Sequence, residues 1–316
     1  MTDIACIGEC MIELKQAGDG LYLRGYGGDT LNTAVYLARL GEKVRYVTAL
    51  GDDPLSDEMN AGWAGEGIET AHVIRLPGKL PGLYLIRNDE RGERQFFHWR
   101  ESSAARGLMD LTETADILEA LQNCKLVYFS AITLSIYGES GRRRLLTALR
   151  KARDAGTSIV FDTNFRSRGW PDLDIARSVY RDAFDAADIV LASTEDLSAL
   201  YPNEGDEGLL ARIPSAEVVL KLSSPSSILR WAGHSLRLQA EPVTKPVVDT
   251  TAAGDSFAAA YISARLAGAD PLEAARAGHR LAGIVVCYPG AIIPRSAMPE
   301  TVGDQPRPAI SSETSP

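Results

Sequence analysis

The strongest constraint on the fold is the alternation of helical and strand patterns that begins at Leu111. Segments with a helical pattern alternate there with short apolar runs that suit buried strands. Helices are predicted at 112–123, 139–155, 175–187 and in two short segments up to 212, and strands at 126–130, 158–162, 189–192 and 218–222. Strands that alternate with helices form a mostly parallel sheet with helices on both faces. The sequence therefore predicts an α/β fold with a doubly wound sheet flanked by helices.

Two pieces of the sequence interrupt this alternation. Residues 80–101 contain two β-rich runs, 81–88 and 94–100, joined by a polar turn, which is the pattern of a hairpin. Residues 11–26 are more polar, are punctuated by glycine and contain a further β-like run. We expect these two pieces to pair as a small β-sheet that projects from the main domain as a lid.

The length and composition fit one globular domain over residues 1–300. Hydrophobic residues make up 45% of the 316-residue chain, so the core needs no disulfide or metal to fold. Residues 303–316 are rich in proline, serine and threonine, and we expect this tail to be disordered.

The charge and the terminal sequence exclude several classes of partner. A net charge of −9 argues against nucleic acid, because its binding needs a basic face. No apolar segment approaches the length of a membrane span, and no signal peptide is visible at the N-terminus. The four cysteines form no CxxC pair and lie in apolar surroundings, so we expect buried free thiols. The sequence therefore predicts a cytoplasmic protein.

Residues 248–257 carry the pattern of an anion-binding helix start. Small residues at 252–254 are followed at once by a helical pattern that ends at Gly268. The first N–H groups of a helix have no intrahelical partner and carry partial positive charge, so they can surround an anionic oxygen. A carboxylate at Asp255 would lie beside that oxygen and accept a proton from a nucleophile. The alternative is a capped helix after a turn, without a ligand.

Common nucleotide and hydrolase signatures are absent: the sequence contains no GxxxxGK[ST], no strand followed by GxGxxG, no HExxH and no GxSxG. Instead, residues 249–257 resemble the C-terminal signature of the ribokinase-like, or PfkB, carbohydrate kinases. Residues 27–32 resemble the N-terminal sugar-binding signature of the same family. The resemblance covers roughly residues 1–300 and implies a ribokinase-like fold and ATP-dependent phosphorylation of a sugar.

Further segments resemble the members of this family that phosphorylate 2-keto-3-deoxygluconate. The matching segments are 7–14, 27–33, 80–84, 92–94, 99–100 and 290–295. They imply transfer of the γ-phosphate of ATP, with Mg²⁺, to the 6-hydroxyl of this sugar acid. Two alternatives stay open: a sibling kinase of the fructokinase or ribokinase type, and a non-catalytic sugar-acid-binding protein on the same fold.

The resemblance also assigns catalytic roles. Asp255 matches the base that takes the proton from the attacking hydroxyl. The N–H groups of Ala252, Ala253 and Gly254 match the anion hole that stabilises the transferring phosphoryl group.

On the substrate side, the resemblance implies contacts from both signatures and from the lid. The matching positions are Gly27, Gly28, Asp29, Asn32, Tyr84, His98, Arg100, Arg166 and Asp255. Arginine binds a carboxylate through two parallel hydrogen bonds, so Arg100 and Arg166 are expected to hold the acid group. Tyr84 would cover the substrate, and His98 occupies a position where relatives typically have tyrosine. The alternatives are solvated arginines and ring side chains on an ordinary hairpin face.

On the nucleotide side, the expected ATP contacts are Ser193, Glu195, Lys221, Thr251, Ala253 and Gly254. Ser193 occupies a position where the family usually has asparagine. Glu195 keeps a carboxylate that would act on Mg²⁺ through water, unless it is an ordinary acidic residue at a helix start. The loop 222–227 lacks the glycine usual in the family, which leaves the adenine contact open. Asp249 either binds a monovalent cation or stabilises the turn.

The predicted lid also bears on assembly. A small exposed sheet has free edges and an apolar face, which form a pairing surface. Members of the family often dimerise through the lid, so the resemblance implies a homodimer.

Overall fold

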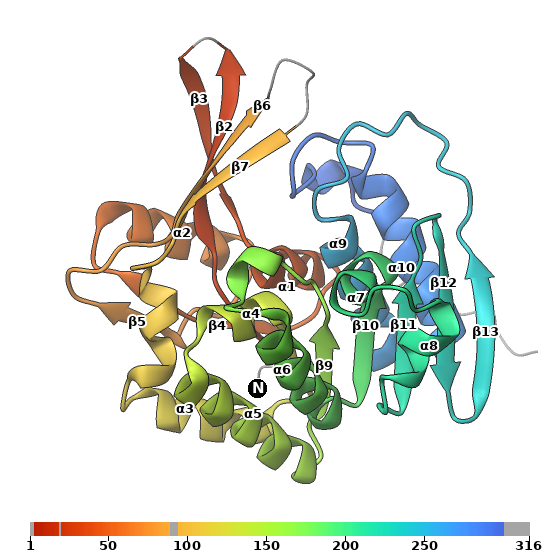
Figure 1. The fold of residues 1–316 in the computed structure, drawn as a ribbon. Helices are drawn as coiled ribbons and strands as arrows, with labels where there is room; N and C mark the ends of the chain where they lie inside the picture. Colours follow the sequence, from red (N-terminus) through yellow and green to blue (C-terminus); the bar gives the residue numbers. More distant parts are fainter. Residues whose placement is uncertain (1–2, 19, 89–93, 300–316) are drawn as a thin grey trace, which may run out of the picture.

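The computed structural model describes residues 3–18, 20–88 and 94–299. Within these ranges the chain forms a nine-stranded sheet with helices on both faces and a separate four-stranded sheet (Figure 1). The helices are α1 (Asp29–Arg39), α2 (Pro54–Gly65), α3 (Thr114–Ala120), α4 (Ala131–Ile136), α5 (Glu139–Asp154), α6 (Leu173–Ala186), α7 (Thr194–Leu200), α8 (Asp206–Ala211), α9 (Ala253–Leu266) and α10 (Pro271–Val285).

The large sheet is mostly parallel. Its strands lie in the order β13 (His234–Gln239), β12 (Ser226–Trp231), β11 (Glu217–Lys221), β10 (Ile189–Ser193), β9 (Ser158–Asp162), β8 (Leu126–Ser130), β1 (Ile4–Ile7), β4 (Val44–Gly51) and β5 (Val73–Leu76). All neighbours from β11 to β5 pair in parallel, and only the β11–β12 and β12–β13 pairs are antiparallel. The chain builds outward from β1 to β4 and β5, then returns to the other side of β1 with β8. At such a switch point the carboxyl ends of the strands leave a crevice that binds ligands.

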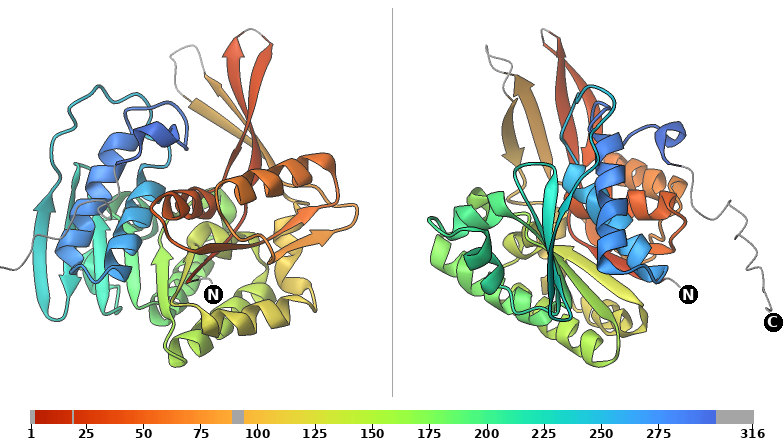
Figure 2. Two further views of the ribbon diagram at one scale, coloured as in Figure 1. Left: turned by 180° about the vertical axis from the view of Figure 1, so that it is seen from behind. Right: turned by 90° about the vertical axis from the view of Figure 1, so that its right-hand side faces the viewer.

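The sheet lies between two helical layers, which the right-hand view of Figure 2 separates. One apolar core packs α5 and α6 against the sheet, and the other packs α1, α9 and α10 against the opposite face. Val127 and Phe129 of β8 belong to the first core, whereas Leu126 and Tyr128 belong to the second. Successive side chains of a strand point to opposite faces, so a strand buried on both sides must be apolar throughout.

The four-stranded sheet projects away from the large sheet and its helices (Figure 1), and it begins at Met11, shortly after β1 ends. Its strands lie in the order β3 (Leu21–Gly27), β2 (Met11–Gly18), β6 (Leu83–Asn88) and β7 (Arg94–Trp99). Tyr84, Phe96 and His98 stack on one face. Phe97 and Trp99, at the alternate positions of β7, are exposed on the other face. We call this four-stranded sheet, together with Arg100 directly after β7, the lid.

The predicted fold class is confirmed, and the differences have local causes. The sequence pattern predicts a helix at 33–40, whereas α1 begins at Asp29, because Gly28 is extended and Asp29 places an acidic side chain in the first turn. α4 was not predicted; it follows β8 directly and is capped by Ser130, whose side chain accepts from the N–H of Thr133. The edge strand β5 was also not predicted. The turn at 89–93 and the tail at 303–316 lie outside the described residues.

The cysteines match the sequence prediction with one exception. Cys6, Cys10 and Cys124 are buried free thiols, whereas Cys287 is free but only partly buried. Among the described residues, we find no helix long and apolar enough to cross a membrane.

Candidate active site

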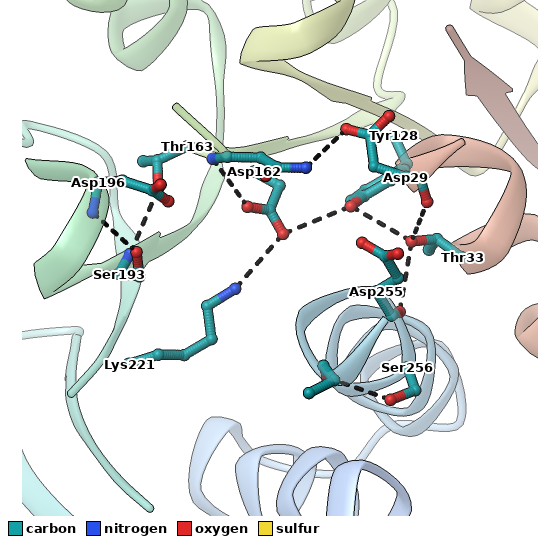
Figure 3. Close-up of polar contacts among 12 residues, drawn as sticks. Asp29, Thr33, Tyr128, Asp162, Thr163, Ser193, Asp196, Lys221, Asp255 and Ser256 are labelled. Atoms are coloured by element: carbon teal, nitrogen blue, oxygen red, sulfur yellow. Dashed lines mark hydrogen bonds and ion pairs between the residues drawn. The ribbon is translucent and has the colours of Figure 1, made fainter. Parts of the chain in front are cut away.

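Polar side chains gather at the carboxyl ends of β9, β10 and β11. Asp162, Ser193 and Lys221 are the last residues of these three strands. Lys221 Nζ lies 3.4 Å from Asp162 Oδ2, and the Tyr128 hydroxyl donates to the same oxygen at 3.4 Å (Figure 3). Burial raises the pKa of the Asp162 carboxyl, while the Lys221 ammonium acts in the opposite direction. Asp162 is not among the predicted site residues, although an aspartate that ends a buried strand is a recognisable signal.

The start of α9 contributes to the same region. Ala252, the residue before α9, has a left-handed backbone with φ of 59°, a strained conformation for alanine. Its methyl group cannot accept hydrogen bonds from the first turn. The N–H of Ala253 donates to Thr250 O at 3.2 Å, so the turn itself uses one of the predicted anion-hole donors. Lys221 Nζ would lie 3.7 Å from a Cβ on Gly254, which brings the amine to the helix start.

Asp255 lies in the first turn of α9 and is held from α1. Asn32 Nδ2 donates to Asp255 Oδ2 at 2.8 Å, and the Thr33 hydroxyl donates to the Asp255 carbonyl oxygen at 3.3 Å. Burial and then the nearby Asp29 carboxylate raise the pKa of Asp255 to about 8. A carboxyl group with such a pKa is close to the range in which a general base works best at neutral pH.

Asp29, the first residue of α1, faces the loop after β9. Asn164 Nδ2 donates to Asp29 Oδ2 at 2.8 Å. Asn164 is a candidate site residue that the sequence did not predict, and its signal is its position shortly after the strand that ends at Asp162. The Asp29 and Asp162 carboxylates both contribute to the raised pKa of Asp255. The three acids therefore lie within electrostatic reach of one another, although they come from three different elements.

Two predicted substrate residues lie on the lid, and each contacts a glutamate. Arg100 forms an ion pair with Glu9, the second residue after β1. The Tyr84 hydroxyl donates to the Glu13 carboxylate. Burial and the Glu13 carboxylate raise the pKa of the Tyr84 phenol, and Asp255 contributes more weakly. Tyr84 is therefore within electrostatic reach of the predicted base.

The glycines at 27 and 28 fit closely against these groups. A Cβ on Gly27 would lie 2.1 Å from the Tyr84 hydroxyl oxygen, and a Cβ on Gly28 would lie 2.2 Å from the Glu9 carbonyl oxygen. The contact at Gly28 is with backbone and leaves no room for a side chain, whereas a Cβ on Gly27 would force the Tyr84 ring to move. The resemblance implies that both glycines contact the substrate. In the structure, their close neighbours are the Tyr84 hydroxyl of the lid and the Glu9 carbonyl oxygen of the segment after β1.

Positive charge acts on the face of the lid that carries Tyr84 and His98, which we call its inner face. Burial lowers the pKa of His98, and the cations Arg100 and Arg168 lower it further. Arg168 lies beside the predicted Arg166, in the loop that follows β9, and was not predicted. The Arg166 side chain is exposed; its Nη1 donates to the Phe165 carbonyl oxygen and lies 3.8 Å from Asp196 Oδ1. Two segments thus present arginine to the space beside His98.

The predicted nucleotide residues at β10 have different environments. The Ser193 hydroxyl accepts from the N–H of Asp196 at 3.1 Å and so caps α7. Glu195 is exposed in the first turn of α7. Asp196 is buried and accepts from the Thr163 hydroxyl and from the N–H of Phe165. Asp196, which was also missed, therefore braces the loop that carries Asn164.

Asp249 and Thr251 form the turn before α9. Asp249 Oδ1 accepts from the N–H of Thr251 at 2.9 Å, and Oδ2 accepts from the N–H of Gly290 at 2.9 Å. Lys15 of β2 lies 3.8 Å from the same Oδ2. These contacts support the turn-stabilising interpretation of Asp249. In the part of the chain that the structure describes, no three His, Cys, Asp or Glu side chains are grouped to hold a metal ion.

A cavity of about 270 Å³ lies between α10 and residues 238–245, on the side of Lys221 where His279 lies. His279 of α10 lines it, and its Nε2 lies 3.1 Å from the hydroxyl of Ser227, the second residue of β12 and the last of the predicted loop 222–227. Burial and the nearby Lys221 ammonium lower the pKa of His279 to about 4, so this ring is neutral at physiological pH. The cavity therefore adjoins the loop whose missing glycine left the adenine contact open.

Comparison with known proteins identifies the family. Residues 1–298 match the pattern of the family described as "pfkB family carbohydrate kinase". The chain is 42% identical over 306 residues to 2-dehydro-3-deoxygluconokinase of Escherichia coli K12, and 43% identical over 307 residues to that of Dickeya dadantii. Each alignment covers 94% of this chain and 98% of the relative.

A solved structure agrees with this result at the level of the fold. The fructokinase with bound ATP from Xylella fastidiosa has a TM-score of 0.81 and 22% identity, over 94% of this chain and 95% of that one. The family pattern and the relatives cover nearly the whole sequence, and the chain therefore belongs to the pfkB family of carbohydrate kinases.

Proposed function

We propose that this protein transfers the γ-phosphate of ATP to the 6-hydroxyl of 2-keto-3-deoxygluconate, also named 2-dehydro-3-deoxygluconate. The observation that carries the chemistry is Asp255, held by Asn32 in the first turn of α9, where the amine of Lys221 also lies. The substrate follows from the near full-length likeness to two proteins named 2-dehydro-3-deoxygluconokinase.

Asp255 accepts the proton of the 6-hydroxyl as that oxygen attacks the γ-phosphate. Asn32 orients the carboxylate, and a pKa of about 8 gives it enough basicity for this transfer. The positive end of α9, with the amides of Ala252 and Gly254, and the Lys221 ammonium stabilise the charge on the transferring phosphoryl group, while the N–H of Ala253 is used by the turn. Asp29 accepts a hydrogen bond from a sugar hydroxyl.

Arg100 and Arg166 bind the carboxylate of the sugar acid, and Tyr84 covers the sugar. The support is electrostatic. Arg100 and Arg168 both act on His98, and a carboxylate bound beside His98 would be stabilised by the same positive charges. A neutral sugar gains less from these charges, because its hydroxyls form weaker hydrogen bonds to arginine than a carboxylate does.

ATP lies on the side of Lys221 where His279 lies, with its base in the cavity beside His279 and Ser227. Mg²⁺ keeps most of its waters and needs only one or two carboxylates besides the phosphates. The exposed carboxylate of Glu195 fits this requirement, whereas Asp162 is already paired with Lys221. When bound, the metal neutralises phosphate charge.

The protein forms a homodimer through the outer face of the lid. Phe97 and Trp99 are exposed there although both are large and apolar. A second copy of the same face would cover them.

A coupled ADP-release assay with keto-deoxygluconate, fructose and ribose tests the function. We expect turnover with the keto-deoxy acid and little with the neutral sugars. Equal rates on fructose or ribose would identify a sibling sugar kinase. Binding of the acid without any ADP release would identify a non-catalytic binding protein.

A further inference from the structure

Two glutamates of one short segment each hold a lid side chain that faces the substrate. Glu9 pairs with Arg100, and Glu13, at the start of β2, pairs with Tyr84. We propose that Glu9 and Glu13 are positioning residues that fix Arg100 and Tyr84 for recognition of the sugar acid. This inference rests on the proposed function and assigns the specificity of the site to a layer behind the residues that touch the substrate.

The Glu9–Arg100 pair is buried yet incomplete. The Glu9 side chain is 1% exposed and that of Arg100 is 18% exposed. A carboxylate loses much solvation when it is buried, so it needs a partner, and Arg100 supplies one. Glu9 Oε1 and Arg100 Nε are nevertheless buried without a hydrogen-bond partner among the described residues. If the pair served stability alone, we would expect both parallel hydrogen bonds of a bidentate arginine–carboxylate pair to form.

The contact with Glu13 determines whether the Tyr84 hydroxyl donates or accepts a hydrogen bond toward the substrate. A carboxylate only accepts hydrogen bonds, so the one proton of the Tyr84 hydroxyl is used by Glu13. Glu13 also helps to raise the pKa of Tyr84, which keeps the phenol protonated. The lone pairs of the phenolic oxygen are therefore left to accept from a hydroxyl of the sugar.

The surrounding glycines keep both pairs in place. A Cβ on Gly82 would lie 2.9 Å from Glu9 Oε1 and 3.2 Å from Arg100 Cβ. Gly28 packs against the Glu9 carbonyl oxygen and Gly27 against the Tyr84 hydroxyl. The sugar-binding signature, the lid and the segment after β1 are therefore fitted to one another through these two glutamates.

A third glutamate provides a matched control. Glu58 of α2 accepts from Arg24 and from the Tyr26 hydroxyl, both on β3. Glu13 lies opposite Gly25 in the β2–β3 register, so Arg24 and Tyr26 lie on the other face of the lid. The Glu58 side chain is 50% exposed. It makes the same kinds of contact as Glu9 and Glu13 but faces away from the site.

The test is a pair of double-mutant cycles with the full-length protein, in which kcat and KM are measured for keto-deoxygluconate. We expect Glu9→Gln and Glu13→Gln each to raise KM about tenfold while kcat stays within about twofold. The effect of Glu9→Gln should vanish in an Arg100→Ala background, and that of Glu13→Gln in a Tyr84→Phe background. Glu58→Gln should change neither constant.

Several outcomes would overturn the inference. Losses that stay the same size in the Arg100→Ala and Tyr84→Phe backgrounds would show that the glutamates act through general stability. If Glu9→Gln does not fold, Glu9→Asp keeps the charge but shortens its reach, and an unchanged KM in that variant contradicts the proposal. Loss of the cooperative thermal transition in both Glu9 variants would mark a purely structural role. A wild-type protein inactive on the keto-deoxy acid but active on fructose would refute the proposed substrate instead.

Discussion

The two halves of the site are built differently. On the large sheet, Asp162 and Asp196 are buried and bonded to groups from other elements, and Asp255 is held from α1. On the lid, Arg100 and Tyr84 are each held by a single glutamate, on a sheet that exposes Phe97 and Trp99. Under the proposed function, the chemistry is thus placed on a buried, multiply bonded scaffold, whereas recognition of the acid is placed on a more exposed element with fewer contacts.

We expect the largest effect on turnover from a substitution of Asp255, the proposed base. Asp255→Asn removes the proton acceptor but keeps the shape of the side chain and an oxygen for Asn32. We expect kcat to fall by about 10²–10⁴-fold with little change in substrate affinity, because a positioned base contributes about that much. Steady-state kinetics and a direct binding measurement check this. A loss of only two- or threefold would remove Asp255 from the role of base.

The next effect concerns recognition of the acid. Arg100→Ala and Arg166→Ala should each lower kcat/KM for keto-deoxygluconate by about 10- to 100-fold, since hydrogen bonds to charged groups contribute about 1.5–3 kcal/mol. The weak rate on fructose should stay the same. Arg166 makes the sharper experiment because its side chain is exposed, so its loss leaves the fold intact. Normal activity in Arg166→Ala would count against the carboxylate assignment.

The pH dependence of the rate probes the electrostatics of the large-sheet half. Asp255 must be ionised to accept a proton, and its pKa is about 8. We therefore expect kcat/KM to rise with pH, by about tenfold per unit below that pKa. Asp29→Asn removes a neighbouring negative charge, so the rising limb should move to lower pH. An unchanged limb would show that Asp29 does not influence the base.

The same pKa has a consequence for stability. The folded-state pKa of Asp255 lies above the ordinary carboxyl value of 3.8. Its contribution to the free energy of unfolding is therefore fully present below about pH 4 and is lost as the pH rises through about 8. Asp255→Asn should thus gain stability relative to the wild type between pH 5 and pH 9. Chemical denaturation at both pH values measures this difference.

The smallest effect on turnover is expected from the outer face of the lid. Phe97→Ser together with Trp99→Ser should convert the proposed dimer into a monomer, as light scattering would detect, because these side chains supply its apolar contact. We expect KM to rise by about two- to fivefold, since the lid then loses external support. A wild-type protein that is monomeric at working concentration would contradict the dimer and leave the lid to act alone.

Most of the fold could be predicted because it follows from local pattern. Apolar runs such as 126–130 and 158–162 are buried on both faces, and the helices between them show their own starts and ends. β5 was missed because an edge strand with partly buried residues lacks a continuous apolar run. α4 was missed because it follows β8 without a loop, so no turn separates the two elements.

The candidate site was predicted where it coincides with motifs and missed where it depends on long-range contacts. Asp255 and Gly27 lie in recognisable signatures, and Arg100 lies in the hairpin. Asn164, Asp196 and Glu9 were missed as site residues because each contacts a residue far away in the sequence, such as Asp29, Thr163 and Arg100. The arrangement of the parallel sheet, α1 and the lid in space brings such residues together.

The sequence by itself thus determined the α/β class, the helix start at 252–255 and the family resemblance, since each depends on neighbouring residues or short periods. The tertiary structure decided that Asn32 holds Asp255, that Lys221 pairs with Asp162, and that Glu9 and Glu13 hold the lid residues. The physical reason is that hydrogen bonds and ion pairs act over a few ångströms in space. The fold alone sets which distant residues come that close.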